Sequence, residues 1–123
     1  MPAEKATPER LKELEASRIA WHNRIEALIG EQRIYVDLNT LSGDGTVQLE
    51  RRGTFSDLER FRIELRDGLA LAFWSDDVDD AGNEDPLLLE GVAHFDREKN
   101  RWVATVDADG IRNWSQDRKA GAL

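Results

Sequence analysis

The residues with the clearest capacity for chemistry are carboxylates gathered in one short stretch of the chain. Residues 76–96 contain eight acidic residues and no basic one, so this stretch alone carries a charge of −8. The formal net charge of all 123 residues is also −8, because residues 1–33, 34–75 and 97–123 carry 0, −2 and +2. The acidity is therefore local, and the acidic stretch is either a solvated loop or a surface that binds a partner.

Part of this stretch, residues 76–85, has the composition of a cation-binding loop. Calcium binds about six to eight oxygen ligands, often from a loop that bends at a glycine. Counted from Asp77, the calcium-loop pattern is met by Asp77, Asp79 and Gly82, but its fifth and twelfth positions are apolar. Two ligands are missing, the bidentate acid among them. We expect at most weak calcium binding at Asp77 and Asp79, and no other metal or cofactor.

The histidines are the other candidates for chemistry, as acid–base catalysts. His94 and Asp96 would share one face of a predicted strand, and His22 lies between charged residues of a predicted helix. The sequence contains none of the common nucleophile, phosphate-binding or metalloprotease motifs, and nothing marks a substrate cleft. The absence of cysteine excludes disulfides and thiolate metal sites. We therefore expect a protein that is not an enzyme.

Protein binding is the leading hypothesis for the acidic stretch, with a basic protein surface as the partner. Trp74 comes directly before it, and an exposed tryptophan ringed by polar groups often supplies much of the binding energy of an interface. Trp74 lies either in the core or at the surface, and the second placement would make it the anchor. The predicted partner-binding residues are Trp74, Asp76, Asp77, Asp79, Asp80, Glu84 and Asp85.

A second charged feature is a basic stripe formed by Arg60, Arg62 and Arg66 on the outer face of a predicted strand. Glu64 lies among them and partly neutralises the stripe. Nucleic-acid-binding modules combine a basic face with exposed aromatic residues, whereas this chain is acidic, so we expect no direct nucleic-acid binding. The stripe either keeps a strand face soluble or docks on an acidic partner.

The first element that the sequence predicts is a helix of about 22 residues. Thr7-Pro8-Glu9 is typical of a helix start, and Gly30 is a suitable C-terminal cap. Residues 11, 14, 18, 21, 25 and 28 form a stripe that is apolar except at Arg18. This spacing is also that of a coiled-coil seam, so the stripe either packs on the chain's own sheet or forms a homodimer.

Beyond residue 33 the apolar residues alternate with polar ones, which is typical of strands. The predicted strands are residues 34–38, 47–49, 61–65, 69–74, 88–96 and 101–107. A three-residue loop at 66–68 would pair residues 61–65 with 69–73 and place all their large apolar side chains on one face. We expect a single helical turn after Ser56 and Asp57, and a last one near Trp114.

One helix followed by about six short strands predicts an α+β fold with a curled antiparallel sheet or a small barrel. Over about half of the chain, the sequence of glycine-flanked strands, acidic loop and tryptophan-initiated strand resembles the rhythm of SH3-like barrels, which implies a shape and no activity. We expect one domain over residues 1–123, with disordered tails at 1–6 and 116–123.

The sequence thus predicts a small non-enzymatic interaction module. No apolar run approaches the roughly 18 residues needed to cross a bilayer, and no apolar leader is present, so we expect no membrane contact and a cytoplasmic location. One alternative is an acidic inhibitor, of the immunity-protein or nucleic-acid-mimic type. Another is a dimeric chaperone or assembly factor that acts through the N-terminal helix.

Overall fold

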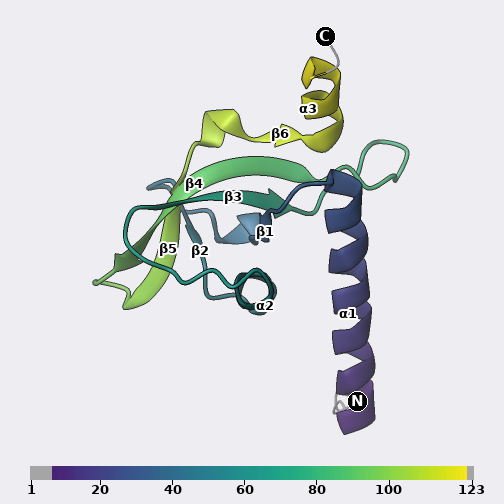
Figure 1. Ribbon diagram of the computed structural model, residues 1–123, viewed down its shortest axis with the longest axis horizontal. Coiled ribbons are helices and arrows are strands. Elements are labelled where there is room, and N and C mark those ends of the chain that lie inside the picture. The colour runs from purple at the N-terminus through teal and green to yellow at the C-terminus, as the bar shows by residue number, and fades with distance from the viewer. Residues whose placement is uncertain (1–6, 122–123) are drawn as a thin grey trace, which may run out of the picture. The chain divides into compact units, whose positions relative to one another are not determined.

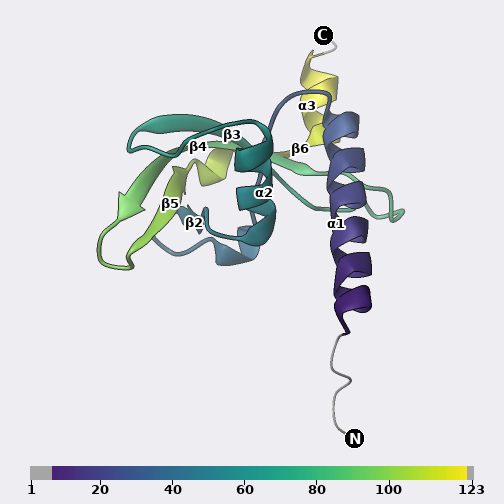
Figure 2. The ribbon, with the colours of Figure 1, turned by 60° about the horizontal axis from the view of Figure 1, so that its bottom comes forward.

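The computed structural model describes residues 7–121, with side chains as far as residue 118. The chain divides into two compact units, residues 1–31 and 32–123. The first unit contains one long helix, and the second contains a curled sheet with two further helices (Figures 1 and 2). Each unit is described by itself below.

Helix α1 (Pro8–Ile29) confirms the predicted N-terminal helix with both of its ends. The Thr7 hydroxyl accepts a hydrogen bond from the backbone N–H of Arg10 at 3.2 Å, and Pro8 occupies the first turn. Gly30 ends the helix in the left-handed conformation, with φ 77°. These caps satisfy backbone groups that the helix itself leaves without partners, which is why sequence alone defines the boundaries.

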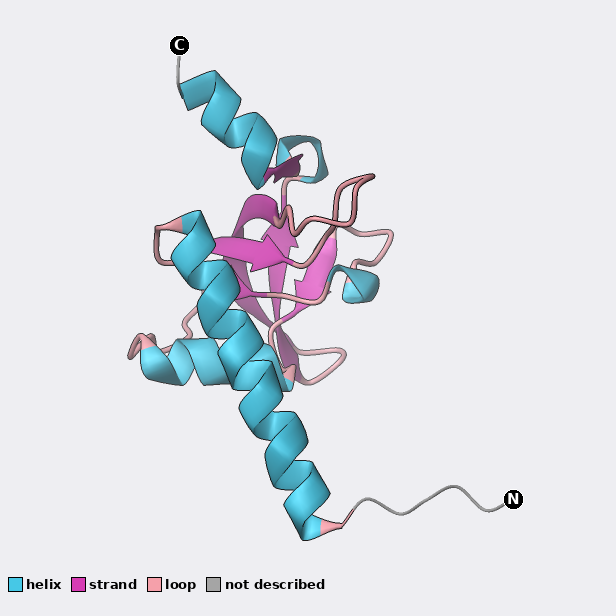
Figure 3. Ribbon diagram, turned by 90° about the vertical axis from the view of Figure 1, so that its right-hand side faces the viewer, coloured by secondary structure: helices cyan, strands magenta, loops and turns pink. Residues whose placement is uncertain are grey.

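The second unit is built on a strongly curled, six-stranded mixed sheet, a half-barrel (Figure 3). The main strand order is β1-β3-β4-β5-β2, and β6 pairs with β4. The predicted α+β class is confirmed, but β1 and β3 are parallel, so the sheet is not purely antiparallel. The strands are β1 (Ile34–Tyr35), β2 (Thr46–Gln48), β3 (Leu69–Ser75), β4 (Leu87–Asp96), β5 (Arg101–Val106) and β6 (Arg112–Asn113).

The hairpin of β4 with β5 agrees with the prediction. Ala93 pairs with Ala104 and Asp96 with Arg101, across the four-residue loop 97–100. Asn100 adopts φ 54° there, a conformation that asparagine tolerates better than most residues. Burial alternates over only part of each strand, but their connection is short, so their pairing is a local property of the sequence.

The predicted strand 61–65 and its hairpin with 69–73 are wrong. Helix α2 (Arg52–Arg60) occupies the preceding residues, and the chain leaves it through Arg62 with φ 56°. The N–H of Ile63 donates to the carbonyl of Leu58 at 2.8 Å, a closure typical of helix C-termini. The antiparallel partner of β3 is β4, with Leu71 opposite Gly91. Residues 61, 63 and 65 still pack on the core, but from an irregular segment.

Two shorter elements also differ from expectation. β1 ends at Tyr35 because Asp37 accepts a hydrogen bond from Asn39 N–H and starts a 3₁₀ turn, Leu38–Thr40. Helix α3 (Trp114–Gly121) continues through residues for which a disordered tail was predicted. Residues 1–6 and 122–123, the rest of the predicted tails, lie outside the described residues.

The core of the second unit lies between the concave face of the sheet, α2 and the segment after it. Phe73 and Leu89 are fully buried at its centre, on neighbouring strands. Gly91 faces Phe73 and lets β4 and β5 approach closely. The buried core consists of Ile34, Val36, Val47, Leu49, Leu58, Leu71, Phe73, Leu89, Ala93, Ala104 and Val106.

Gly91→Ala is expected to destabilise the protein. An added methyl carbon would lie 2.6 Å from the carbonyl oxygen of Thr105 and 2.9 Å from Cγ1 of Val106. Overpacking of this kind costs about 1–3 kcal/mol in the free energy of unfolding, which urea denaturation measures. The matched control is Gly43→Ala, where nothing lies within 4 Å of the new carbon. Equal stability of the two variants would contradict this account of β4.

Candidate functional site

The acidic residues 76–85 form an ordered hairpin between β3 and β4, called here the acidic hairpin. Val78 and Glu84 form an antiparallel bridge, and Asp79 N–H donates to the carbonyl of Asn83 at 2.8 Å. The Asp79 carboxylate accepts the backbone N–H groups of Ala81 and Asn83 at 3.0 and 2.8 Å. Asp79 therefore shapes the tip of the hairpin instead of facing a ligand.

The base of the acidic hairpin is fastened to β6 and α3. Asn113 Nδ2 donates to Oδ2 of Asp77 and to the backbone carbonyl of Asp85, both at 2.9 Å. The Asp85 carboxylate accepts the N–H of Ser115 at 2.9 Å and its hydroxyl at 2.6 Å. Asp85 is only 8% exposed and satisfies the first turn of α3, so its predicted role as a partner contact is replaced by a structural one.

Two carboxylates of the acidic hairpin are left for a partner, those of Asp76 and Asp80. Both are exposed, and neither forms a hydrogen bond or ion pair with another residue in the described part of the chain. Val78 lies between them and is 58% exposed. The candidate binding surface of the hairpin is therefore Asp76, Val78 and Asp80.

Trp74 is not part of that surface. It is 0% exposed, and its ring contacts the Tyr35 ring edge-on, with the ring centres 5.0 Å apart. Trp74 lies on β3, between β1 on one side and β4 on the other, and the strand continues past it to Ser75. The sequence left both placements of Trp74 open, and the structure shows that it lies in the core. Val78, which the sequence analysis did not consider, is the exposed apolar residue here.

The weak calcium site expected at Asp77 and Asp79 receives no further acidic ligand. Within the described residues, no group of three or more histidine, cysteine, aspartate or glutamate side chains could hold a metal ion. Asp77 and Asp79 are engaged by Asn113 and by the hairpin's own backbone. Their oxygens are thus directed to different partners rather than toward one point.

The remaining acidic charge of residues 76–96 is also used within the fold. Arg112 donates to both carboxylate oxygens of Glu90, at 2.5 and 2.9 Å, and to Asp117 at 3.2 Å. Its hydrogen bonds hold the pKa of Glu90 below the ordinary value, and the same pairing raises the pKa of Arg112. Asp96 accepts the N–H groups of residues 98 and 99 in the β4–β5 loop.

The predicted basic stripe does not exist as one strand face. Arg60 is the last residue of α2, where its guanidinium lies over the Phe61 ring and 3.7 Å from Asp57 Oδ1. Arg62 has the left-handed conformation that ends the helix, and Arg66 lies in the turn before β3. The three arginines belong to three different local geometries, because the residues between them do not form a strand.

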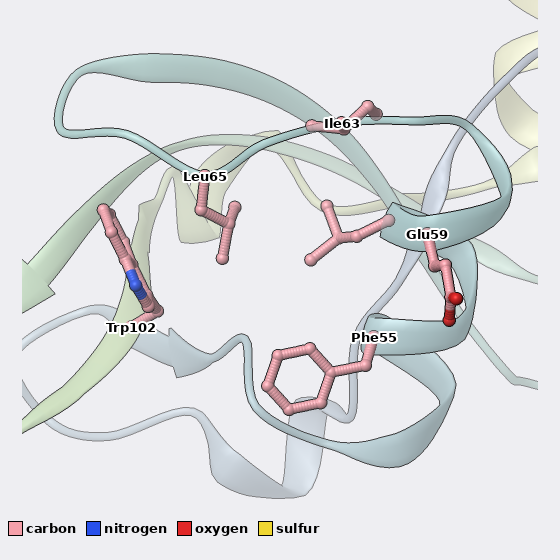
Figure 4. Close-up of a pocket in the computed structure, with 6 residues that line it drawn as sticks. Phe55, Glu59, Ile63, Leu65 and Trp102 are labelled. Carbon is pink, nitrogen blue, oxygen red and sulfur yellow. The ribbon is translucent and has the colours of Figure 1, made fainter.

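A feature that the sequence analysis missed is an open apolar groove between α2, the segment after it and β5 (Figure 4). Its volume is about 630 Å³. Trp102 and Leu65 lie at one end of the groove and Glu59 lies at the other. Phe55, which is 48% exposed, lies along one side. The lining residues are Phe55, Leu58, Glu59, Ile63, Leu65 and Trp102.

The signal for this groove was present in the sequence at helical spacing. Phe55, Leu58 and Glu59 stand at positions i, i+3 and i+4, which share one face of a helix. We predicted only one helical turn, starting at Ser56 and Asp57, because those residues resemble a cap. In the structure the helix begins at Arg52, and the Asp57 side chain bonds a strand instead.

Helix α2 is fixed to the edge of the sheet by two of its own side chains. The Asp57 carboxylate accepts the backbone N–H of Tyr35 at 2.9 Å, and the Thr54 hydroxyl donates to the Tyr35 carbonyl at 2.7 Å. Thr54 and Asp57 are 0% and 3% exposed. They act toward β1 as a neighbouring strand would, and they set the position of Phe55 and Leu58 in the groove.

Comparisons with known proteins supply no family: no family model, no curated protein and no solved structure matches the chain. Among the described residues, no helix is long and apolar enough to cross a membrane. The functional argument therefore depends on the two surfaces described above, the acidic hairpin and the apolar groove.

Thr54→Val is expected to loosen α2 from β1. Valine keeps the shape of the side chain but removes the hydroxyl donor, and the partly buried Tyr35 carbonyl loses a partner. The free energy of unfolding should fall by about 1–3 kcal/mol in urea denaturation. Ser56→Ala, on the same helix and without a hydrogen bond from its side chain in the described structure, is the matched control. A loss as large in the control would show that the Thr54 contact is not responsible.

Proposed function

We propose that the protein is a non-enzymatic interaction module that presents the acidic hairpin to a basic surface of another protein. The observation that carries the proposal is the division of carboxylates within the hairpin. Asp77 and Asp85 fasten it to β6 and α3, while Asp76 and Asp80 extend beside the exposed Val78 without partners in the described chain. The hairpin is thus fixed in place and still carries free charge.

A fixed hairpin favours binding because little conformational entropy is lost when a partner docks. Exposed carboxylates would mainly set the association rate and the choice of partner, since complementary charges steer the encounter. Val78 would add the apolar contact that the sequence analysis had considered for Trp74. Such binding weakens as salt increases, because exposed charges are screened over about 8 Å at physiological ionic strength.

Asp76→Asn with Asp80→Asn is expected to weaken partner binding by about fivefold, since an exposed charge contributes about 0.2–1 kcal/mol. Both changes keep side-chain size and remove only charge. The partner would be captured from native lysate on the wild-type protein, identified, purified and titrated at low and high ionic strength. The measured quantity is the dissociation constant.

The matched control is Glu98→Gln with Asp109→Asn, which removes two exposed charges far from the hairpin in sequence. It should bind the partner as the wild type does. Equal affinity of the hairpin variant and the control, or an affinity that does not change with salt, would refute the proposed role of the hairpin.

The alternatives from the sequence differ in what they require. An inhibitor that mimics nucleic acid needs carboxylates spread over a surface, whereas the carboxylates of residues 76–85 are gathered in one hairpin, where those of Asp77, Asp79 and Asp85 accept hydrogen bonds. The cytoplasmic location and the inhibitor function stay predictions.

A second candidate function, a dimeric assembly factor, is favoured by exposed apolar residues on α1. Leu11 and Leu14 are 54% and 48% exposed on the stripe that has coiled-coil spacing. A second copy of α1 would cover both residues along the same stripe.

If this dimer forms, Leu14→Glu should raise its dissociation constant by at least about tenfold, because burying a leucine contributes about 1.5–3 kcal/mol. Ala16→Glu introduces the same charge outside the stripe and should leave the dimer intact. Sedimentation velocity over a range of concentrations measures both. A wild-type protein that stays monomeric would dispose of the dimeric candidate.

A further inference from the structure

We propose that the apolar groove between α2 and β5 is a second binding site, which takes a peptide segment of a partner protein with large apolar side chains next to a lysine or arginine. The site shares no residue with the acidic hairpin, so the inference stands apart from the function proposed above. It follows from three properties of the groove: its lining, its one charge and its rigidity.

The lining is suited to apolar side chains. Phe55, Leu65 and Trp102 surround an opening of about 630 Å³, within the range of roughly 300–1,000 Å³ typical of ligand sites. Phe55 is 48% exposed, so a large aromatic face stays in contact with water unless something covers it. Covering that face removes apolar area from water, which is the main source of affinity for such a groove.

The charge at the groove is a single carboxylate without a partner. Glu59 is exposed, and no other residue of the described chain forms a hydrogen bond or ion pair with its carboxylate. The adjacent arginine, Arg60, is turned toward Phe61 and Asp57. Glu59 lies at one end of the apolar lining (Figure 4), so a cation would be complementary there and apolar groups along the rest.

The walls of the groove are held before any ligand arrives. Asp57 and Thr54 fix α2 to Tyr35, as described above. The segment after α2 is held to the helix where Ile63 N–H donates to the Leu58 carbonyl at 2.8 Å. Little conformational entropy of the site would therefore be lost when a peptide binds, which favours measurable affinity for a short segment.

The shape and the charge of the groove together favour a peptide over a small molecule or a second copy of the chain. The groove is open, and its lining runs from Trp102 to Glu59 (Figure 4), whereas small-molecule sites enclose most of their ligand. An extended or helical segment can follow an open groove and still place one basic side chain at its end. A second copy of the chain in the groove is an outcome that the experiment below identifies.

The test starts from a phage-displayed library of random peptides of about 12 residues, selected on the full-length protein. The selected peptides are synthesised and their dissociation constants are measured by fluorescence polarisation. We expect a consensus of two or more large apolar residues with a lysine or arginine at a fixed spacing. Phe55→Ser, a change at a half-exposed position that should leave the fold intact, is expected to weaken binding by about tenfold or more.

A double-mutant cycle tests the role of Glu59. Glu59→Gln should weaken a lysine-containing peptide by roughly threefold to tenfold and leave its lysine-to-norleucine analogue unchanged. Asp76→Asn with Asp80→Asn should bind the peptides like the wild type, which separates a failure of this site from a failure of the hairpin. Circular dichroism of each variant verifies that the fold is retained.

Three results would overturn the proposal. The first is a selection that yields no consensus, or a consensus without a basic residue. The second is unchanged binding by Phe55→Ser, which would place the peptides elsewhere. The third is a wild-type dimer in sedimentation that Phe55→Ser abolishes, which would assign the groove to a second copy of this chain.

Discussion

The second unit depends on one contact, the capture of the Tyr35 backbone by two side chains of α2. β1 lies at the edge of the sheet, where its outer N–H and carbonyl would otherwise face no strand. The Asp57 carboxylate accepts the Tyr35 N–H at 2.9 Å, and the Thr54 hydroxyl donates to the Tyr35 carbonyl at 2.7 Å. An unsatisfied buried backbone group costs about as much as a lost hydrogen bond, so these contacts are hard to give up. They close the sheet edge and set the angle at which α2 crosses it.

Both candidate surfaces follow from contacts of this kind, in which polar side chains substitute for secondary structure. The Thr54 and Asp57 contacts hold one wall of the groove, and Asp85 with Ser115 holds the base of the acidic hairpin. In each case a buried or partly buried polar group positions exposed ones. An acidic hairpin that selects a partner by charge and a groove that supplies apolar contact would complement each other in one interaction module.

The charge pattern in the sequence located a candidate site but did not show which acids are available. Eight acidic residues lie between 76 and 96, yet the structure uses Asp77, Asp79 and Asp85 within the hairpin and its base, and Glu90 with Arg112. Hydrogen bonding from groups distant in the sequence makes this division, and no spacing rule predicts it. The same limit applies to Trp74, whose burial depends on strands that come from both sides of it in the chain.

What the sequence by itself determined are the elements whose stabilising contacts lie within a few residues. Thr7 and Gly30 cap α1, and β4 and β5 are joined by only four residues, so local patterns define them. Only the tertiary structure decided the rest. Apolar and polar side chains alternate in residues 61–65 as they do in a strand, and this alternation is enough for residues 61, 63 and 65 to pack on the core. A strand also needs a neighbouring strand to bond its backbone, and these residues have none in the sheet. β4 takes that place beside β3, and α2 is positioned by the hydrogen bonds of Thr54 and Asp57 to Tyr35, which is far from them in the chain.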